Sequence, residues 1–379
     1  KSTMSVAVIG GGISGCVAVL CLHQQGIETV WIKPTVRLCN RLEWPESISW
    51  QGLERLADFI DLETFINDHG FPEHVQSSCW GSNQLLSRSK QRMSRQSNDT
   101  QLVNKAALIE ILSRKAENTS CELIRGRVER IERQNNLWQL HINHQAVRSV
   151  DVLVLAHGNG PSSRFSIPAK ATTNDILQCH HWILSKKNTE AEHSNTGSLV
   201  EACPEGWWYA ATLGLNKISI TSFQHPTTIT ADHWQAEYLR NRLNNTIHLK
   251  SWIQESQWRH FQRPRIFRLH CQCREQFSGG GFDAASPFWF SVGDAAATLD
   301  PLSSFGSTNG IWSASKAAES IGSILNNLNS NASKNYNNAM HRLHHTTLLQ
   351  RQQMYDLEQR FKQHPFWMFR TARPAESTT

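Results

Sequence analysis

The N-terminal residues alternate between short apolar runs and small or polar residues, in the order of a strand, a tight turn, a helix and a second strand. Residues 5–9 are a short β-branched run that suits a buried parallel strand. Residues 16–25 are apolar and small along one side, and Gly26 is a typical helix stop. Residues 28–33 predict the next strand. This order predicts the beginning of an α/β domain.

Later patterns predict a mixture of antiparallel strands and helices. Residues 197–224 have the pattern of an antiparallel pair that turns at residues 214–216, whereas residues 231–257 and 310–362 are mostly helical. The remaining predicted elements are a polar loop region, a helix and three strands, at residues 81–101, 108–116, 121–131, 137–142 and 149–156. We find no internal repeat.

A glycine-rich turn follows the first predicted strand and opens the first predicted helix. Its pattern, Gly10-x-Gly12-x-x-Gly15, is the fingerprint of dinucleotide binding in the context that this motif requires. The first glycine permits the tight turn, the second lets the backbone approach a pyrophosphate, and the third lets helix and strand pack closely. The predicted cofactor-binding residues of this turn are Gly10, Gly11, Gly12, Ser14 and Gly15. The alternative is an ordinary tight turn in an α/β domain.

The second predicted strand ends in Lys33, where dinucleotide-binding folds usually have an acid that accepts hydrogen bonds from ribose hydroxyls. A lysine side chain has no hydrogen-bond acceptor. Either the adenosine end of the cofactor is held differently, or Lys33 approaches a phosphate. We include Lys33 among the predicted cofactor-binding residues, and the alternative is a solvated lysine at a strand end.

A second signature lies far from the first along the chain. The apolar run 288–292 ends in Gly293-Asp294-Ala-Ala, and the loop 300–308 follows. With the glycine turn, this motif resembles the flavin-dependent monooxygenases and halogenases, which have the glutathione-reductase-like FAD fold. In that family the aspartate of the Gly-Asp pair meets the ribityl chain of FAD, and the following loop and helix start lie against the flavin ring. The resemblance implies FAD as the cofactor and the following binding residues: Gly293, Asp294, Pro301, Gly306, Ser307 and Thr308.

A third element of that family is altered in this chain. The predicted strand at residues 149–156 is followed by His157-Gly158, where the family has an Asp-Gly pair. In hydroxylases with that motif, the aspartate is linked to the use of both FAD and NADPH. The replacement by His157 implies an external reductant other than NADPH alone, and Gly158 stays a predicted cofactor-binding residue. The alternative is a strand-end histidine without a role.

Three features of the tryptophan halogenases are missing from the sequence. Their Gly-Trp-x-Trp-x-Ile-Pro stretch corresponds to residues 206–211, which lack the second tryptophan, the isoleucine and the proline. The region that holds the halogenase lysine has none between residues 51 and 89, and the next lysine is Lys90. Ser303 occupies the position of the halogenase glutamate. These differences predict that the chain does not halogenate.

Residues 205–209, 300–304 and 355–370 together resemble a narrower group of flavoproteins. These accompany glycine and lysine oxidases and quinohemoprotein amine dehydrogenases, which carry cysteine tryptophylquinone. The resemblance implies a monooxygenase that uses O₂ to hydroxylate a tryptophan side chain in the precursor of such an enzyme. The alternatives are hairpin packing for residues 206–209 and ordinary helix packing for the C-terminal segment.

Aromatic and titratable residues supply the candidates for the chemistry. The predicted indole-lining residues, which offer flat aromatic surface, are Trp207, Trp208 and Tyr209. Hydroxylation can also need a base for the ring proton, and the predicted catalytic residues are Asp300, Ser303 and His157. His180 and His181 are further candidates for the base, and their alternative is a structural pair.

The composition excludes several other classes of protein. The net charge is only +6. Charged residues make up 18% of the chain and are spread along it, which disfavours a nucleic-acid binder with a dense basic stripe. The longest apolar runs are far shorter than the roughly 20 residues of a membrane span, and the start lacks the pattern of a signal peptide. Nine scattered cysteines without a Cys-x-x-Cys pair predict reduced thiols in the cytoplasm and no metal site.

The two signatures must meet at one flavin, and this requirement predicts the domain organisation. We expect a discontinuous FAD-binding domain of the Rossmann type from residues 1–45, 100–165 and 275–325. An antiparallel-sheet substrate domain is expected from residues 46–99 and 166–274, with a helical C-terminal region from residues 326–379. Two other functions stay open, namely a flavin monooxygenase of a small aromatic molecule and a flavoprotein chaperone for the precursor.

Overall fold

A computed structural model of the chain describes residues 4–35, 45–71, 75–89, 100–143, 145, 147–159, 167, 169–185, 197–214, 216–253, 261–282, 286–327, 329 and 331–371. The chain divides into two compact units. The first unit comprises Lys1–His69, Val103–Asn174 and Cys271–Thr347. The second unit comprises Gly70–Leu102, Asp175–His270 and Leu348–Thr379.

The first unit is built on a six-stranded sheet. In spatial order its strands are β17 (Ser278–Gly279), β18 (Phe288–Ser291), β11 (Val152–Leu155), β1 (Val6–Ile9), β2 (Thr29–Lys33) and β7 (Glu122–Arg125). Neighbouring strands from β18 to β7 run parallel, and β17 is antiparallel to β18. Parallel strands are usually covered on both faces, which agrees with the complete burial of β1, β11 and β18.

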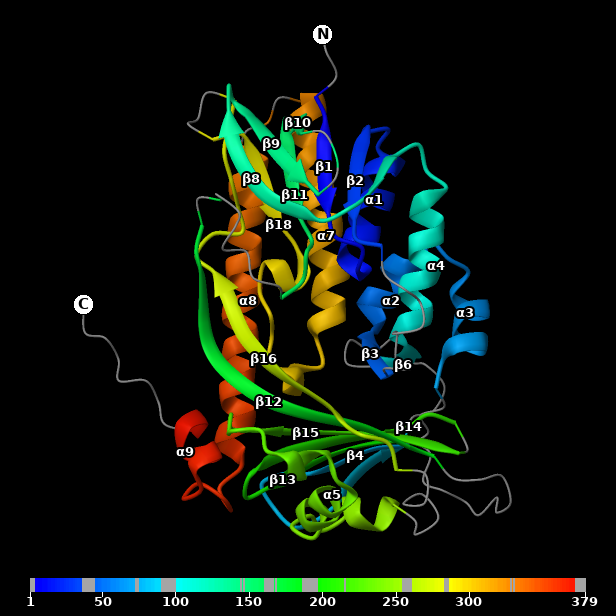
Figure 1. The fold of residues 1–379 in the computed structure, drawn as a ribbon, viewed down its shortest axis with the longest axis vertical. Coiled ribbons are helices and arrows are strands. Elements are labelled where there is room, and N and C mark those ends of the chain that lie inside the picture. The colour runs from blue at the N-terminus through cyan, green and yellow to red at the C-terminus, as the bar shows by residue number, and fades with distance from the viewer. Residues whose placement is uncertain are drawn as a thin grey trace, which may run out of the picture. The chain divides into compact units, whose positions relative to one another are not determined.

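Side chains of β1 enter two different cores, because successive side chains of a strand point to opposite faces. Val6 and Val8 pack in the core that contains the buried faces of α1 (Ile13–Gln24), α4 (Lys105–Glu117) and α7 (Gly306–Asn327). Figure 1 shows α1 and α7 beside this sheet. Ala7 and Ile9 pack with Trp138 of a three-stranded antiparallel sheet. That sheet consists of β8 (Val128–Gln134), β9 (Leu137–Ile142) and β10 (Arg148–Val150).

Residues 46–69 lie in the first unit, whereas we expected them in the substrate domain. They form the elements β3 (Pro45–Ser49), α2 (Trp50–Leu56) and α3 (Leu62–His69), and β3 pairs with β6 (Thr100–Asn104). Ile48, Leu53 and Phe65 are buried in the core that contains α1 and α7. Apolar packing of these side chains therefore decides the place of the segment.

The second unit is built on a seven-stranded sheet. In spatial order its strands are β16 (Arg265–Arg274), β12 (Ala171–Ser185), β15 (Lys217–Gln224), β14 (Gly206–Thr212), β13 (Gly197–Cys203), β4 (Val75–Cys79) and β5 (Leu86–Ser89). Strands β12 to β13 pair antiparallel, β13 and β4 pair parallel, and β4 and β5 pair antiparallel. The predicted antiparallel pair within residues 197–224 is confirmed by β14 and β15, and Leu215 of its turn lies outside the described residues.

One face of this sheet is covered by short helical elements (Figure 1). These are η2 (Ala231–Trp234), α5 (Ala236–Leu243) and η3 (Leu249–Trp252). Leu239 and Leu249 of these elements are fully buried in one core with Trp182 and Trp208. The mostly helical structure predicted for residues 231–257 thus consists of three short elements up to Trp252, and residues 254–257 lie outside the described residues.

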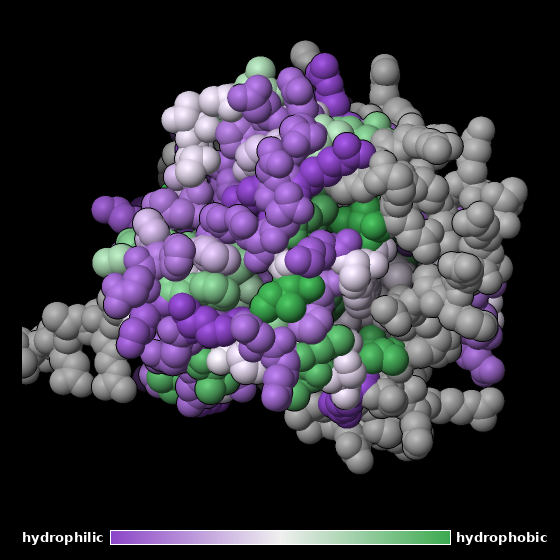
Figure 2. All heavy atoms as spheres, turned by 90° about the horizontal axis from the view of Figure 1, so that it is seen from below, coloured by the Kyte–Doolittle hydropathy of each residue, from purple (hydrophilic) through white to green (hydrophobic). Residues whose placement is uncertain are grey.

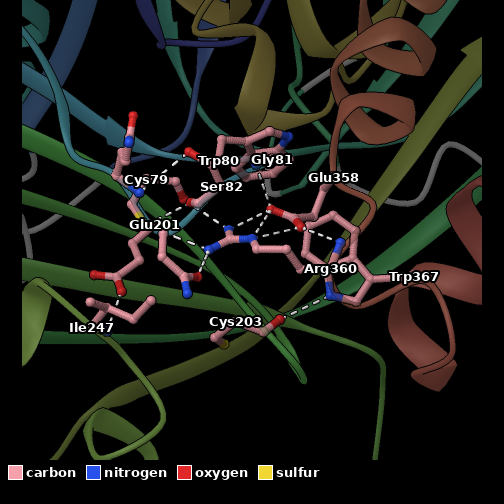
Figure 3. A network of polar contacts seen from close by, with 12 residues as sticks. Cys79, Trp80, Gly81, Ser82, Glu201, Cys203, Ile247, Glu358, Arg360 and Trp367 are labelled. Carbon is pink, nitrogen blue, oxygen red and sulfur yellow. Dashed lines mark hydrogen bonds and ion pairs between the residues drawn. The ribbon is translucent and has the colours of Figure 1, made fainter.

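We expected residues 326–379 to form a separate helical region, but the structure divides them between the two units. Helix α8 (Asn331–Leu357) begins in the first unit and ends in the second, and α9 (Pro365–Thr371) follows. In the second unit, the buried carboxylate of Glu358 accepts hydrogen bonds from Gly81 N at 2.8 Å and from Arg360 Nη2 at 2.6 Å (Figure 3). Trp367 Nε1 donates to Cys203 O at 2.9 Å. These contacts agree with the packing alternative for residues 355–370.

The surface seen from the side of α5 is mostly hydrophilic, and its apolar residues form separate groups (Figure 2). Among the described helices, none is both long and apolar enough to cross a bilayer.

Candidate functional site

The glycine turn lies between β1 and α1, and its three motif glycines differ in their steric surroundings. A Cβ on Gly10 would lie 2.1 Å from Ala156 O, and the φ of Gly10 is +130°. A Cβ on Gly15 would lie 2.2 Å from Gly10 O, whereas a Cβ on Gly12 would meet no heavy atom within 4 Å. The fold therefore requires glycine at the first and third positions. Gly12 faces open space at the N-terminus of α1, where a helix stabilises a phosphate.

The two sequence signatures meet in the first unit. Gly293 begins the short element η4 (Gly293–Ala295) with a φ of +55°. A Cβ on Gly293 would lie 2.2 Å from Ser14 Oγ, and a Cβ on Gly310 of α7 would lie 2.6 Å from the same oxygen. Asp294 follows Gly293 directly. This arrangement is the one that both motifs need if they bind one cofactor.

Asp294 belongs to a cluster of three charges with Lys105 and Glu46. Lys105 Nζ lies 2.9 Å from Glu46 Oε2. Desolvation raises the pKa of Asp294, Lys105 opposes this shift and Glu46 adds to it. Burial acts to lower the pKa of Lys105, but Glu46 and Asp294 raise it overall. Asp294 is nevertheless exposed and the Lys105 side chain is 38% exposed. We call the accessible space at Asp294, Gly12 and Gly306 the hollow, because a Cβ on either glycine would meet no heavy atom within 4 Å.

The N-terminus of α7 carries hydroxyl groups that bind β3. Ser307 Oγ donates to Glu46 Oε1 at 2.6 Å, and Thr308 Oγ1 lies 3.1 Å from Ser49 Oγ. A Cβ on Gly306 would meet no heavy atom within 4 Å. The first turn of α7 is thus held by hydroxyls on one side and is open at Gly306.

Three further residues of the first unit have features that would suit an FAD molecule. Gly158 resembles Gly12 and Gly306, because a Cβ on it would meet no heavy atom within 4 Å, and its φ is +73°. Asn309 Oδ1 and Trp50 Nε1 are buried without a hydrogen-bond partner among the described residues. Phosphates, hydroxyls and ring amide groups of a dinucleotide supply matching donors and acceptors.

The predicted catalytic residues Asp300 and Ser303 stabilise the turn before α7. The turn contains the short element η5 (Pro301–Ser303), and the carboxylate of Asp300 accepts a hydrogen bond from Leu302 N at 2.9 Å. Ser303 Oγ donates to Asp300 O at 2.9 Å. Asp300 is only 4% exposed. Their role in catalysis stays a prediction.

Burial lowers the pKa of all three candidate bases, His157, His180 and His181. Burial, followed by the charge of Arg274, lowers the pKa of His157 to about 4. Burial also lowers the pKa of His180 to about 3 and that of His181 to about 4. All three imidazoles are therefore neutral near pH 7 and are weak bases. His157 follows β11 in the first unit, whereas His180 and His181 lie in β12 within the second.

Lys33 is not a solvated lysine, which was the alternative for this position. It is 7% exposed, and its Nζ donates to Ser113 Oγ at 2.6 Å and forms an ion pair with Glu117 of α4. The hydrogen bond from Lys33 lowers the pKa of Glu117. Helix α4 thus supplies an acid beside the end of β2, and an approach of Lys33 to a phosphate stays a prediction.

The predicted indole-lining residues do not share one surface. Trp207 and Trp208 are adjacent in β14 and point to opposite faces of the sheet. Trp208 packs under α5, whereas Trp207 stacks on Phe223 with ring centroids 4.0 Å apart and donates to Tyr355 Oη at 3.2 Å. Both tryptophans are at most 1% exposed. These contacts agree with the packing alternative, and an indole-binding role stays a prediction.

Known proteins resemble this chain in sequence and in fold. The chain is 23% identical over 380 residues to LodB of Marinomonas mediterranea, named as a FAD-dependent oxidoreductase, and the match covers 96% of each chain. The solved structure of QhpG, a peptidyl tryptophan dihydroxylase essential for tryptophylquinone cofactor biogenesis, matches with a TM-score of 0.72 at 17% identity. This match covers 99% of our chain and 80% of QhpG.

The myxobacterial FAD-dependent halogenase CndH matches with a TM-score of 0.80 at 17% identity, over 99% of our chain and 87% of CndH. The chain has a flavoprotein fold. No protein-family model matches the sequence. The mixed α/β architecture of this flavoprotein fold and the resemblance to flavin-dependent monooxygenases and halogenases are therefore confirmed.

Glu46 and Lys105 are residues of the hollow that we did not predict. The sequence contained one indication of this pair. Lys105 is the first residue of α4, where the helix dipole disfavours a cation, and a lysine at such a position suggests a nearby acidic partner. The ion pair with Glu46 joins residues far apart in the sequence, and no local pattern indicates it. Within the described ranges, no group of three or more His, Cys, Asp or Glu side chains could hold a metal ion.

Proposed function

We propose that this chain is an FAD-dependent monooxygenase that hydroxylates a tryptophan side chain in a partner polypeptide. The observation that carries the proposal is the meeting of the glycine turn, Asp294 and the start of α7 around one hollow in the first unit. The similarity to LodB and to QhpG, whose names give FAD and peptidyl tryptophan, supports both the cofactor and the substrate class. The cytoplasmic location stays a prediction from the cysteines.

The residues of the hollow divide the binding of FAD among them. The backbone of residues 10–15 would hold the pyrophosphate, since Gly12 leaves space at the positive end of α1. Asp294 would form hydrogen bonds with the ribityl hydroxyls, and Lys105 opposes the rise of its pKa that burial causes. The open N-terminus of α7 at Gly306 would face the flavin ring.

Bound FAD supplies the activation of O₂ and the transfer of one oxygen atom to the substrate. In the balanced reaction, a C–H bond of the indole becomes C–OH and the second oxygen atom leaves as water. An external donor supplies two electrons and two protons. The protein must orient the indole and exclude water, and the neutral His157 could accept a hydrogen bond or, weakly, a proton at Nδ1 or Nε2.

The electron donor is proposed to be a separate reductase or free reduced flavin. The second glycine cluster, residues 279–281, begins at the last residue of β17 and precedes the antiparallel β18. A Cβ on Gly280 would lie 2.1 Å from Pro287 O, and the φ of Gly280 is +85°. This cluster makes a hairpin and not the strand-to-helix turn that binds a dinucleotide. Stopped-flow mixing with NADPH should therefore bleach the flavin slowly, and fast bleaching would contradict this choice of donor.

Halogenation is disfavoured by the residues of the turn before α7. Ser303, at the position of the halogenase glutamate, uses its hydroxyl within the turn, and a serine cannot supply a carboxylate. Of the lysines near the hollow, Lys105 is already paired with Glu46. The proposal of hydroxylation therefore stands although the fold also matches halogenases.

Co-expression with a tryptophylquinone-type precursor, followed by mass spectrometry of the precursor, tests the proposal. We expect the precursor to gain the mass of one or two oxygen atoms on a tryptophan, and the Gly12→Val variant should give no gain. An unmodified precursor together with rapid turnover of a free aromatic compound would favour the small-molecule monooxygenase. An unmodified precursor that is stabilised by the chain would favour the chaperone.

A further inference from the structure

A buried arginine in the first unit lacks a carboxylate partner among the described residues. Arg274, the last residue of β16, is 4% exposed. Its Nε donates to Ala295 O at 2.7 Å, and its Nη1 donates to Ala169 O at 3.0 Å. Its backbone N donates to Ala296 O at 3.0 Å. Two of the five N–H groups of the guanidinium therefore donate to neutral main-chain oxygens, which do not cancel its charge.

Burial of an uncompensated charge is expensive for a fold. Desolvation lowers the pKa of Arg274, although an arginine in a protein keeps its proton. A neutral side chain at this position could donate some of the same hydrogen bonds to the main-chain oxygens, and its burial would cost less desolvation energy. A buried charge of this kind can act through its field on a charged group bound nearby.

Two features place the guanidinium near residues that we predict to contact FAD. The guanidinium is bonded to the residue that follows Asp294, at the turn where the two sequence signatures meet. Its charge is also felt at His157, the residue that follows β11, because it helps to lower the pKa of that imidazole. Arg274 thus lies beside the turn that carries Asp294, and its charge influences the pKa of His157, whereas the charges that act on the Asp294 carboxylate are those of Lys105 and Glu46.

We infer that Arg274 is a positioning residue whose charge, unpaired with any carboxylate of the described residues, favours the reduced, negatively charged form of the bound flavin. This inference rests on the proposed function. In the step concerned, the external donor is oxidised by two electrons, and the flavin gains these two electrons and one proton. A fixed positive charge lowers the energy of the product of that step more than the energy of the neutral, oxidised flavin. Arg274 also holds the Ala295 carbonyl, and through it the turn that carries Asp294.

The reduction potential of the FAD-loaded protein separates this role from a purely structural one. Titration against a reference dye should show that Arg274→Met shifts the equilibrium about tenfold toward oxidised flavin. Arg274→Lys, which keeps the charge, should stay close to the parent chain. Arg114→Met is the matched control, because it removes one positive charge from an exposed side chain of the same unit. It should leave the equilibrium unchanged.

An FAD-loaded Arg274→Met protein with the parent equilibrium would overturn the inference and leave the proposed function intact. If that variant does not fold, Arg274→Gln, which keeps one donor for a carbonyl, carries the same expectation and the same contradiction. A parent chain that folds but binds no FAD would overturn the proposed function together with the inference. Nuclear magnetic resonance of His157 adds a readout without cofactor, since its pKa should rise in Arg274→Met and stay low in Arg274→Lys.

Discussion

The glycine-lined hollow of the first unit and the aromatic strand β14 of the second unit differ in how much space the surrounding atoms leave around their residues. Around the hollow, Gly12 and Gly306 have free space where a side chain would stand, and Asp294 is accessible. In β14, Trp207 and Trp208 are buried and packed on both faces of the sheet. The comparison teaches that small residues in a defined turn indicate room for a ligand. A high density of aromatic residues indicates packing.

The largest expected effect separates the two kinds of glycine in the turn. Gly10→Val should cost more than about 4 kcal/mol of stability, because its Cβ would collide with Ala156 O and its φ is positive. Gly12→Val should change the free energy of unfolding by less than about 1 kcal/mol, yet it should abolish FAD binding. Urea unfolding and flavin absorbance measure the two effects. A Gly12→Val protein with full flavin content would refute the role of Gly12.

A substitution in β14 of the second unit should lower stability without changing FAD binding, which is the reverse of the effect expected for Gly12→Val. Trp208→Ala should lower the free energy of unfolding by about 3–5 kcal/mol, because it leaves a cavity under α5. The flavin content of the protein that remains folded should be unchanged. Thermal unfolding with and without FAD provides the measurement. If Trp208→Ala were as stable as the parent chain, the packing interpretation of β14 would be wrong.

Buried histidines should make the protein sensitive to acid. The pKa of His180 is lowered to about 3 in the folded state, whereas the unfolded value is about 6.5. The unfolded chain therefore binds the proton first, and stability falls as the pH drops below about 6.5 toward the folded pKa. His180→Asn should remove about 2 kcal/mol of the stability loss between pH 6.5 and 5, at about 1.4 kcal/mol per pH unit. Equal pH slopes for the variant and the parent chain would contradict this account.

The smallest expected effect concerns the other face of β14. Trp207→Phe keeps an aromatic ring on Phe223 but loses the hydrogen bond to Tyr355 Oη. It should cost about 1 kcal/mol of stability and leave hydroxylation of the precursor unchanged. A normal fold with a selective loss of hydroxylation would instead restore Trp207 as a substrate residue.

The parts of the fold that follow from local patterns were predictable. The first strand, turn, helix and strand occupy residues close to those expected, because their apolar and glycine positions are set within one supersecondary unit. The predicted strand 121–131 is in fact two strands, β7 and β8, with Gly126 between them. A Cβ on Gly126 would lie 2.7 Å from Ile142 Cγ2, and this close approach has no local signal in the sequence.

The candidate site was predictable only where a motif defines it. The two glycine signatures led to the hollow, and the structure joins them at Ser14. Glu46, Lys105 and Arg274 could not be found in this way, because each gains its role from a partner far away in the sequence. The assignment of residues 46–69 to the other domain failed for the same reason, since the core contacts of Leu53 and Phe65 depend on tertiary packing.

One measurement tests the central claim most directly. The purified FAD-loaded chain is mixed with a purified precursor, a reductant and isotopically heavy O₂, and the precursor is then sequenced by tandem mass spectrometry. We predict that the heavy oxygen appears on the ring of a tryptophan residue, and only when the chain, FAD and reductant are all present. Consumption of reductant and O₂ without heavy oxygen in any tryptophan of the precursor would contradict the proposed function.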